Sequence, residues 1–68
     1  MPSSVIRDID YDAERHQLWV TFVSGKTYVY DRVPENIYDA FRTYSTKGGF
    51  FNRFIRDRYR HREVRKAS

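Results

Sequence analysis

Hydrophobic and polar residues alternate along the first half of this 68-residue chain in the manner of β-strands. The alternation is clearest over residues 17–23, where every second side chain is large and apolar: Leu18, Val20 and Phe22. A period of two places successive side chains on opposite faces of a strand, so these three share a face. We predict strands over residues 4–11, 17–23 and 27–31, the first of them an edge strand with a bulge near Arg7.

The turn between the second and third predicted strands decides which side chains join the core. A two-residue loop would place Val29 and Asp31 on the apolar face of the second strand. A three-residue loop with Gly25 in the left-handed conformation would place Tyr28 and Tyr30 there instead. We favour the three-residue loop, because it gathers five large side chains on one face and leaves the aspartate outside.

The hydrophobic period changes to that of a helix after Pro34. This proline suits the first position of a helix, because its missing N–H would have no intrahelical partner there. A core-facing stripe at helical spacing follows, made of Ile37, Ala40, Phe41 and Tyr44. Ser45 or Thr46 can cap a second helix, whose apolar stripe is Phe50, Phe51, Phe54 and Ile55. We therefore predict an α+β fold, a three-stranded antiparallel sheet followed by two short helices packed on one face.

Length and composition narrow the classes of function. A chain of 68 residues has room for one domain, and its aromatic content of 18% supplies much of the core. The absence of cysteine excludes disulfides, and no apolar run is long enough for a signal peptide or a membrane span. We expect a cytoplasmic protein without membrane association. No spacing of histidines or carboxylates indicates a metal site and no serine has an identifiable base, so we expect no cofactor and no enzymatic activity.

Charge is divided unevenly along the chain. Residues 1–41 contain four Lys or Arg and seven Asp or Glu, whereas residues 42–68 contain nine and two. The second part therefore attracts polyanions. Ten of the thirteen basic residues are arginine, whose planar fork binds phosphate through two hydrogen bonds. A GC-rich genome gives the same excess of arginine, so the excess alone does not identify a ligand.

Basic residues interleaved with aromatic side chains indicate a nucleic-acid interface. Bases would stack on Tyr59 or Trp19, and phosphates would contact Lys47, Arg53, Arg56, Arg58, Arg60, Arg62, Arg65 and Lys66. Phosphate contacts carry no sequence information, so we expect low specificity. The alternative is a protein-interaction module, in which the basic residues dock on an acidic partner or the Trp19 face pairs with a second copy; otherwise we expect a monomer.

The segment Thr46-Lys47-Gly48-Gly49 has two interpretations. Free backbone N–H groups at a helix start, beside small glycines and one lysine, form a phosphate seat. The same residues also suit an ordinary helix start, where glycine lets the backbone pack closely. We favour the second interpretation.

A set of anchor residues between positions 4 and 60 resembles the KTSC domain, a small module at the C-terminus of some lysyl-tRNA synthetases that also occurs as a stand-alone bacterial protein. The resemblance rests on Ser4, Ile9, Tyr11-Asp12, Leu18, Val20, Phe22, Ser24-Gly25, Tyr28-Val29-Tyr30, Val33-Pro34, Tyr38, Lys47-Gly48-Gly49-Phe50-Phe51-Asn52 and Ile55. The family pattern has a small residue and then Ser before the Lys-Gly pair, where this chain has Tyr44 and Thr46. The resemblance implies the fold predicted above, and the link to a synthetase implies RNA rather than DNA as the ligand. We divide the chain into a KTSC-like domain over residues 1–57 and a basic C-terminal tail over residues 58–68.

Overall fold

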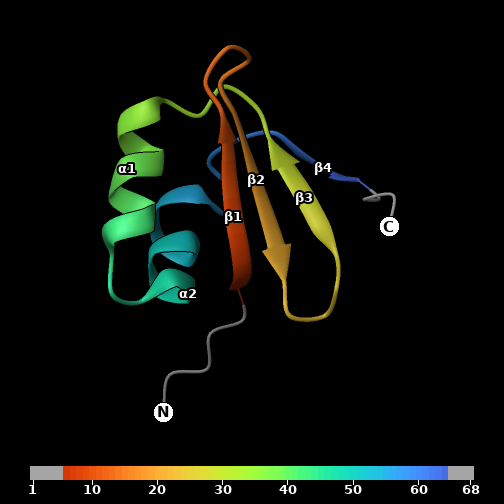
Figure 1. Ribbon diagram of the computed structural model, residues 1–68, viewed down its shortest axis with the longest axis vertical. Helices are drawn as coiled ribbons and strands as arrows, with labels where there is room; N and C mark the ends of the chain where they lie inside the picture. Colours follow the sequence, from red (N-terminus) through yellow and green to blue (C-terminus); the bar gives the residue numbers. More distant parts are fainter. Residues whose placement is uncertain (1–5, 65–68) are drawn as a thin grey trace.

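The alternating first half of the chain forms three antiparallel strands in the computed structural model, which describes residues 6–64. These strands are β1 (Ile6–Asp12), β2 (Gln17–Phe22) and β3 (Thr27–Tyr30) (Figure 1). β1 lies at the edge of the sheet and its register shifts between Ile6 and Asp8, which confirms the bulge expected near Arg7. Residues 4 and 5, which the first predicted strand included, lie outside the described residues.

The register between β2 and β3 confirms the three-residue loop. Leu18 lies opposite Tyr30 and Val20 opposite Tyr28, so the two tyrosines share the apolar face of β2. Gly25 has a φ of 96°, in the left-handed region that glycine adopts without a steric cost. The face that β2 and β3 present to the core is therefore the one expected from the sequence.

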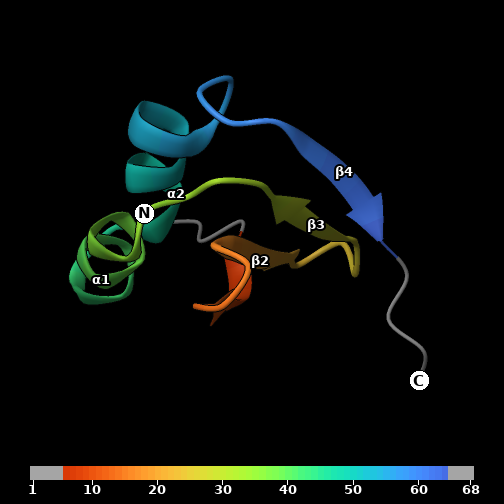
Figure 2. The ribbon, with the colours of Figure 1, turned by 90° about the horizontal axis from the view of Figure 1, so that it is seen from above.

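The sheet has four strands, one more than the sequence predicts. β4 (His61–Val64) pairs antiparallel with β3, and the strand order is β1-β2-β3-β4. Figure 2 shows β4 at the far edge of the sheet from β1. Its side chains are exposed except for the half-buried Val64, and besides its backbone pairing the ring of His61 stacks on that of Tyr30 with centroids 5.1 Å apart. The prediction of three strands is wrong because hydrophobic alternation cannot reveal a strand whose side chains mostly face solvent.

The first helix, α1 (Glu35–Thr43), begins one residue later than expected, with Pro34 in the extended conformation at its N-cap. Phe41 is fully buried and Ile37 half-buried, whereas Ala40 and Tyr44 are exposed. The predicted apolar stripe is thus only partly correct. The buried face is rotated toward Tyr38, whose ring stacks on Tyr11 with centroids 5.0 Å apart.

The second helical segment consists of α2 (Lys47–Phe50) followed directly by the π-helical turn η1 (Phe51–Ile55). Thr46 occupies the N-cap as predicted, but its side chain makes no capping hydrogen bond. A Cβ atom at Gly49 would lie 3.2 Å from Cγ2 of Thr46, so the side chain of the N-cap residue lies close to this glycine. The stripe buries Phe50, Phe51 and Ile55 and leaves Phe54 38% exposed.

The helices cover one face of the sheet and enclose a core dominated by aromatic rings (Figure 2). Phe41 stacks on Phe50 with centroids 5.2 Å apart, and Phe51 forms T-shaped ring contacts with Phe22 and Tyr30. The apolar residues Leu18, Val20, Val33 and Ile55 are fully buried among these rings. Of the helices within residues 6–64, none combines the length and the apolar character needed to cross a bilayer.

Candidate nucleic-acid interface

Three connections meet at one end of the sheet: the β1–β2 turn, the β3–α1 connection and the η1–β4 connection (Figure 1). The N–H of Val33 donates to the carbonyl of His16 at 2.9 Å, which joins the first two. The N–H of Asp31 donates to the carbonyl of Arg60 at 2.8 Å, which joins the second and third. Residues far apart in the sequence are thereby held side by side.

Each of these connections contains one non-glycine residue in the left-handed region. The φ angles are 54° at His16, 57° at Arg32 and 64° at Asp57. Such conformations are uncommon for residues with a side chain and cluster at functional sites, because the surrounding structure must offset their cost. The three left-handed residues therefore mark this end of the sheet as a candidate ligand site.

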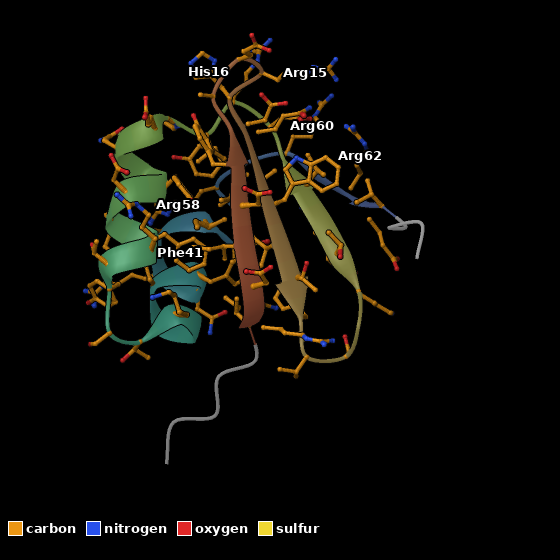
Figure 3. All side chains as sticks on the ribbon, viewed as in Figure 1. Arg15, His16, Phe41, Arg58, Arg60 and Arg62 are labelled. Atoms are coloured by element: carbon orange, nitrogen blue, oxygen red, sulfur yellow. The ribbon has the colours of Figure 1, made fainter. Side chains whose placement is uncertain are left out.

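Arginines from all three connections gather around Tyr59. Arg58 and Arg60, which the sequence analysis selected, are joined by Arg15 from the β1–β2 turn and Arg32 from the β3–α1 connection. Together with Asp31 and Tyr59, the four arginines line an open depression of about 720 Å³. Figure 3 shows Arg15, Arg60 and Arg62 at this end of the molecule.

A second depression adjoins the first and shares two of its residues. Arg58 and Tyr59 line both, and the second also includes Asn52, Arg53, Arg56 and Asp57 from the end of η1. Tyr59 is half-buried and packs against the hydrophobic core, so its ring is supported from below. We refer to Arg15, Arg32, Arg53, Arg56, Arg58 and Arg60 as the arginine cluster.

The arginine cluster carries an uncompensated positive charge. All six side chains are exposed, and within residues 6–64 none of them forms an ion pair. The ion pairs in that part of the chain involve other arginines: Arg42 with Asp39, and Arg62 with Asp31. Arg58 is oriented by its Nε, which donates to the carbonyl of Arg53 at 3.2 Å. Asp31 and Asp57 are the two acidic residues lining the depressions, which leaves the arginines in excess.

Three other predicted contact residues do not join the cluster. The ammonium of Lys47 donates to the carbonyls of Arg42 and Tyr44 at 3.1 and 2.8 Å, so it serves the end of α1 rather than a phosphate seat. Trp19 and Arg62 both lie opposite Val29, one on each side, and so share the sheet face that points away from the helices. The remaining two, Arg65 and Lys66, lie outside the described residues.

Arg15 and Arg32 were not predicted as site residues, because both belong to the part of the chain with more acidic than basic residues. A signal was nevertheless present in the predicted topology. In an antiparallel sheet of consecutive strands, the turn after the first strand and the residues after the third lie at the same end. The shared position of these two segments predicts that Arg15 and Arg32, one in each, lie close together.

Two tyrosines near the cluster have a pKa raised above the usual value of 10.0. Burial raises the pKa of Tyr30 to about 12; Tyr28 adds to the rise and Arg56 opposes it. Burial also raises the pKa of Tyr11, with smaller contributions from the charges of Glu35, Asp12 and Asp39. The hydroxyl of Tyr11 donates to the carbonyl of Val33 at 2.6 Å, which ties β1 to the connection that carries Arg32. Within residues 6–64, no group of three or more His, Asp or Glu is arranged to hold a metal ion.

A meander sheet with both helices on one face and an arginine cluster at one end defines a small α+β module, and the comparisons with known proteins identify its family. The KTSC domain model matches residues 2–59, so this chain belongs to the KTSC domain family, as the anchor residues implied. The crystal structure of a KTSC domain protein from Yersinia pestis is similar with a TM-score of 0.85 and 34% identity, covering 94% of this chain and 90% of that one.

Two relatives in sequence have different lengths. A protein from Tsukamurella paurometabola is 33% identical over 58 residues, which is 85% of this chain and 87% of the relative. A lysine–tRNA ligase from Nostoc punctiforme is 30% identical over 61 residues. That match takes in 90% of this chain, but the chain spans only 11% of the length of the ligase.

Proposed function

We propose that this protein is a small, non-enzymatic nucleic-acid-binding module that prefers RNA to DNA and has low sequence specificity. The proposal rests on the arginine cluster, whose six exposed guanidinium groups surround the half-buried ring of Tyr59. Guanidinium groups bind phosphates through paired hydrogen bonds, and a tyrosine ring offers a face on which a base stacks. Arginine and aromatic side chains in this arrangement suit a nucleic acid better than a small anion.

The preference for RNA is supported by the occurrence of a similar segment in a lysine–tRNA ligase. With RNA as its ligand, the protein would act in the cytoplasm. Low specificity follows from the exposure of the arginines, because exposed guanidinium groups contact phosphates, which are the same at every nucleotide.

The test is a titration of fluorescently labelled RNA and DNA oligonucleotides of the same sequence, about 10 nucleotides long, followed by anisotropy at about 50 and 200 mM salt. Each phosphate contact on a single strand contributes about 0.7 to the slope of log affinity against log salt, so up to six contacts give a slope of about −4. RNA should bind more tightly than DNA. Absence of any anisotropy change at the lower salt concentration would refute the proposal.

An acidic protein partner is the competing explanation for the same charges. Polyglutamate with the length and charge of the RNA oligonucleotide distinguishes a nucleic acid from an acidic protein, because it offers carboxylates but no bases for Tyr59. The double variant Arg58→Glu and Arg60→Glu should lose RNA binding. If polyglutamate binds the wild-type protein as tightly as RNA does, the surface is assigned to an acidic polypeptide instead.

A further inference from the structure

A third depression extends the basic surface beyond the two already described. It lies at the start of α1 and is lined by His16, Val33, Pro34 and Glu35, together with Arg15 and Arg32. Those two arginines also line the first depression, just as Arg58 and Tyr59 line both the first and the second, so the first depression is the middle one of the three. The three depressions therefore adjoin one another, separated by shared pairs of residues, and we call the series the track.

We propose that this track binds single-stranded nucleic acid that runs from the end of η1 to the start of α1, an inference that rests on the proposed function. A series of adjoining depressions suits an extended chain more than a single phosphate or a compact ligand. Tyr59 forms a wall between two depressions and is half-buried, so a base must leave its stack to contact the ring. Bases in a duplex are already stacked on one another, whereas those of a single strand are available.

The chemistry along the track alternates between groups that bind phosphates and groups that bind bases. Arg58 and the pair Arg15 and Arg32 stand in the walls, where they meet a sugar–phosphate chain crossing from one depression to the next. Tyr59 and the exposed ring of Pro34 offer apolar surface beside those arginines, which suits the flat face of a base. This order of arginines and apolar rings matches the alternating phosphates and bases of a nucleic-acid strand.

Asp31 determines which part of a nucleotide can occupy the middle depression. One carboxylate oxygen accepts a hydrogen bond from Nε2 of Gln17 at 3.2 Å, and the other lies 3.9 Å from Nη1 of Arg62. A fixed carboxylate repels phosphates and accepts hydrogen bonds from amino groups on base edges. Phosphates are thereby kept at the arginine walls, and a base is favoured over the aspartate.

Arg15 and Arg32 are the residues that distinguish this track from a basic C-terminal tail. A tail bound by charge alone would include neither, because both lie in the first half of the sequence. The variant that tests them is Arg15→Gln with Arg32→Asn, since asparagine tolerates the left-handed backbone found at residue 32. The matched control is Arg7→Gln with Lys26→Gln, which removes two exposed positive charges outside the track.

The experiment measures binding of the full chain to a labelled single-stranded RNA and to a duplex RNA of equal length, with each competing against the other. The wild-type protein should prefer the single strand by about tenfold, the equivalent of one stacked base. The Arg15→Gln, Arg32→Asn variant should bind the single strand about fivefold more weakly, with a salt slope smaller by about 1.4. The control variant should retain most of the affinity.

Two results would overturn the inference while leaving the proposed function in place. The first is equal or tighter binding of the duplex by the wild-type protein, and the second is an equal loss of affinity in the two double variants. The first would show that the ligand is not a single strand, and the second that net charge rather than the track determines binding. If neither RNA binds at low salt, the proposed function itself fails, and this inference fails with it.

Discussion

The hydrogen bond from Tyr11 to Val33 is the feature whose removal tests the structure most directly. The hydroxyl of Tyr11 donates to the carbonyl of Val33 at 2.6 Å, and Val33 itself is fully buried. Replacing Tyr11 with Phe deletes the donor but keeps the ring that stacks on Tyr38 at 5.0 Å. A buried carbonyl left without its partner costs about 1–3 kcal/mol, and water reaching this partly buried bond reduces the expected loss to about 1–2 kcal/mol.

This loss is large enough to measure in a small domain. A change of 1 kcal/mol shifts the melting temperature of a 60–100-residue domain by about 4–8 °C, so Tyr11→Phe should lower Tm by roughly 4–16 °C. The assay is thermal and urea unfolding followed by circular dichroism. Tyr38→Phe is the matched control, because it removes a hydroxyl from the other ring of the stack, one without a hydrogen-bond partner among residues 6–64.

The same pair of proteins gives a second readout at alkaline pH. The pKa of Tyr11 is raised above its usual 10.0 in the folded state, mainly by burial. Its contribution to stability is therefore complete below pH 10 and is lost as the pH rises through the folded-state pKa. The stability difference between the wild-type protein and Tyr11→Phe should narrow above pH 10. Equal melting temperatures for Tyr11→Phe and Tyr38→Phe at neutral pH would refute the reasoning.

Two further predictions concern the core. Phe41→Ala should cost about 3–5 kcal/mol, enough to unfold much of so small a domain at 25 °C, whereas Phe54→Ala, at a ring that is 38% exposed, should cost about 1 kcal/mol. Urea unfolding measures both, and equal losses at the two positions would contradict the core described here. Because the pKa of Tyr30 is about 12, one tyrosine should titrate near that pH by absorbance at 295 nm, and stability should fall as pH rises from about 10 to 12. Tyr30→Phe should remove this late component, and a titration unchanged by the substitution would count against the burial of that ring.

The elements with a strong apolar period were predictable from the sequence. Alternation located β2, and the choice between two loop lengths at Gly25 could be made because only one of them grouped Tyr28 and Tyr30 with the apolar residues of β2. β4 could not be found this way, because its side chains are mostly exposed and show no apolar alternation. The partial burial of Tyr38 in place of Tyr44 could not be predicted either, since both fit a helical stripe and only the packing of Tyr38 against Tyr11 decides between them.

The candidate site was predictable only in part. Charge along the sequence selected Arg58 and Arg60, which do lie in the cluster. Charge selected Lys47 equally, because composition does not reveal that the Lys47 ammonium donates to two carbonyls at the end of α1. It excluded Arg15 and Arg32 because their neighbours in the sequence are acidic, although their neighbours in space are arginines. Which charges act together is decided by the topology of the connections.

The pairing of β4 with β3 also affects the order in which the molecule assembles. β1, β2 and β3 are joined by short turns and need little loop closure, whereas β3 and β4 are separated by the whole helical segment. Contacts between distant parts of a chain form late, because the intervening segment must be ordered first. We therefore expect the sheet edge that holds Arg60 through the N–H of Asp31 to be completed late, and the arginine cluster to reach its final shape only after the rest of the domain has folded.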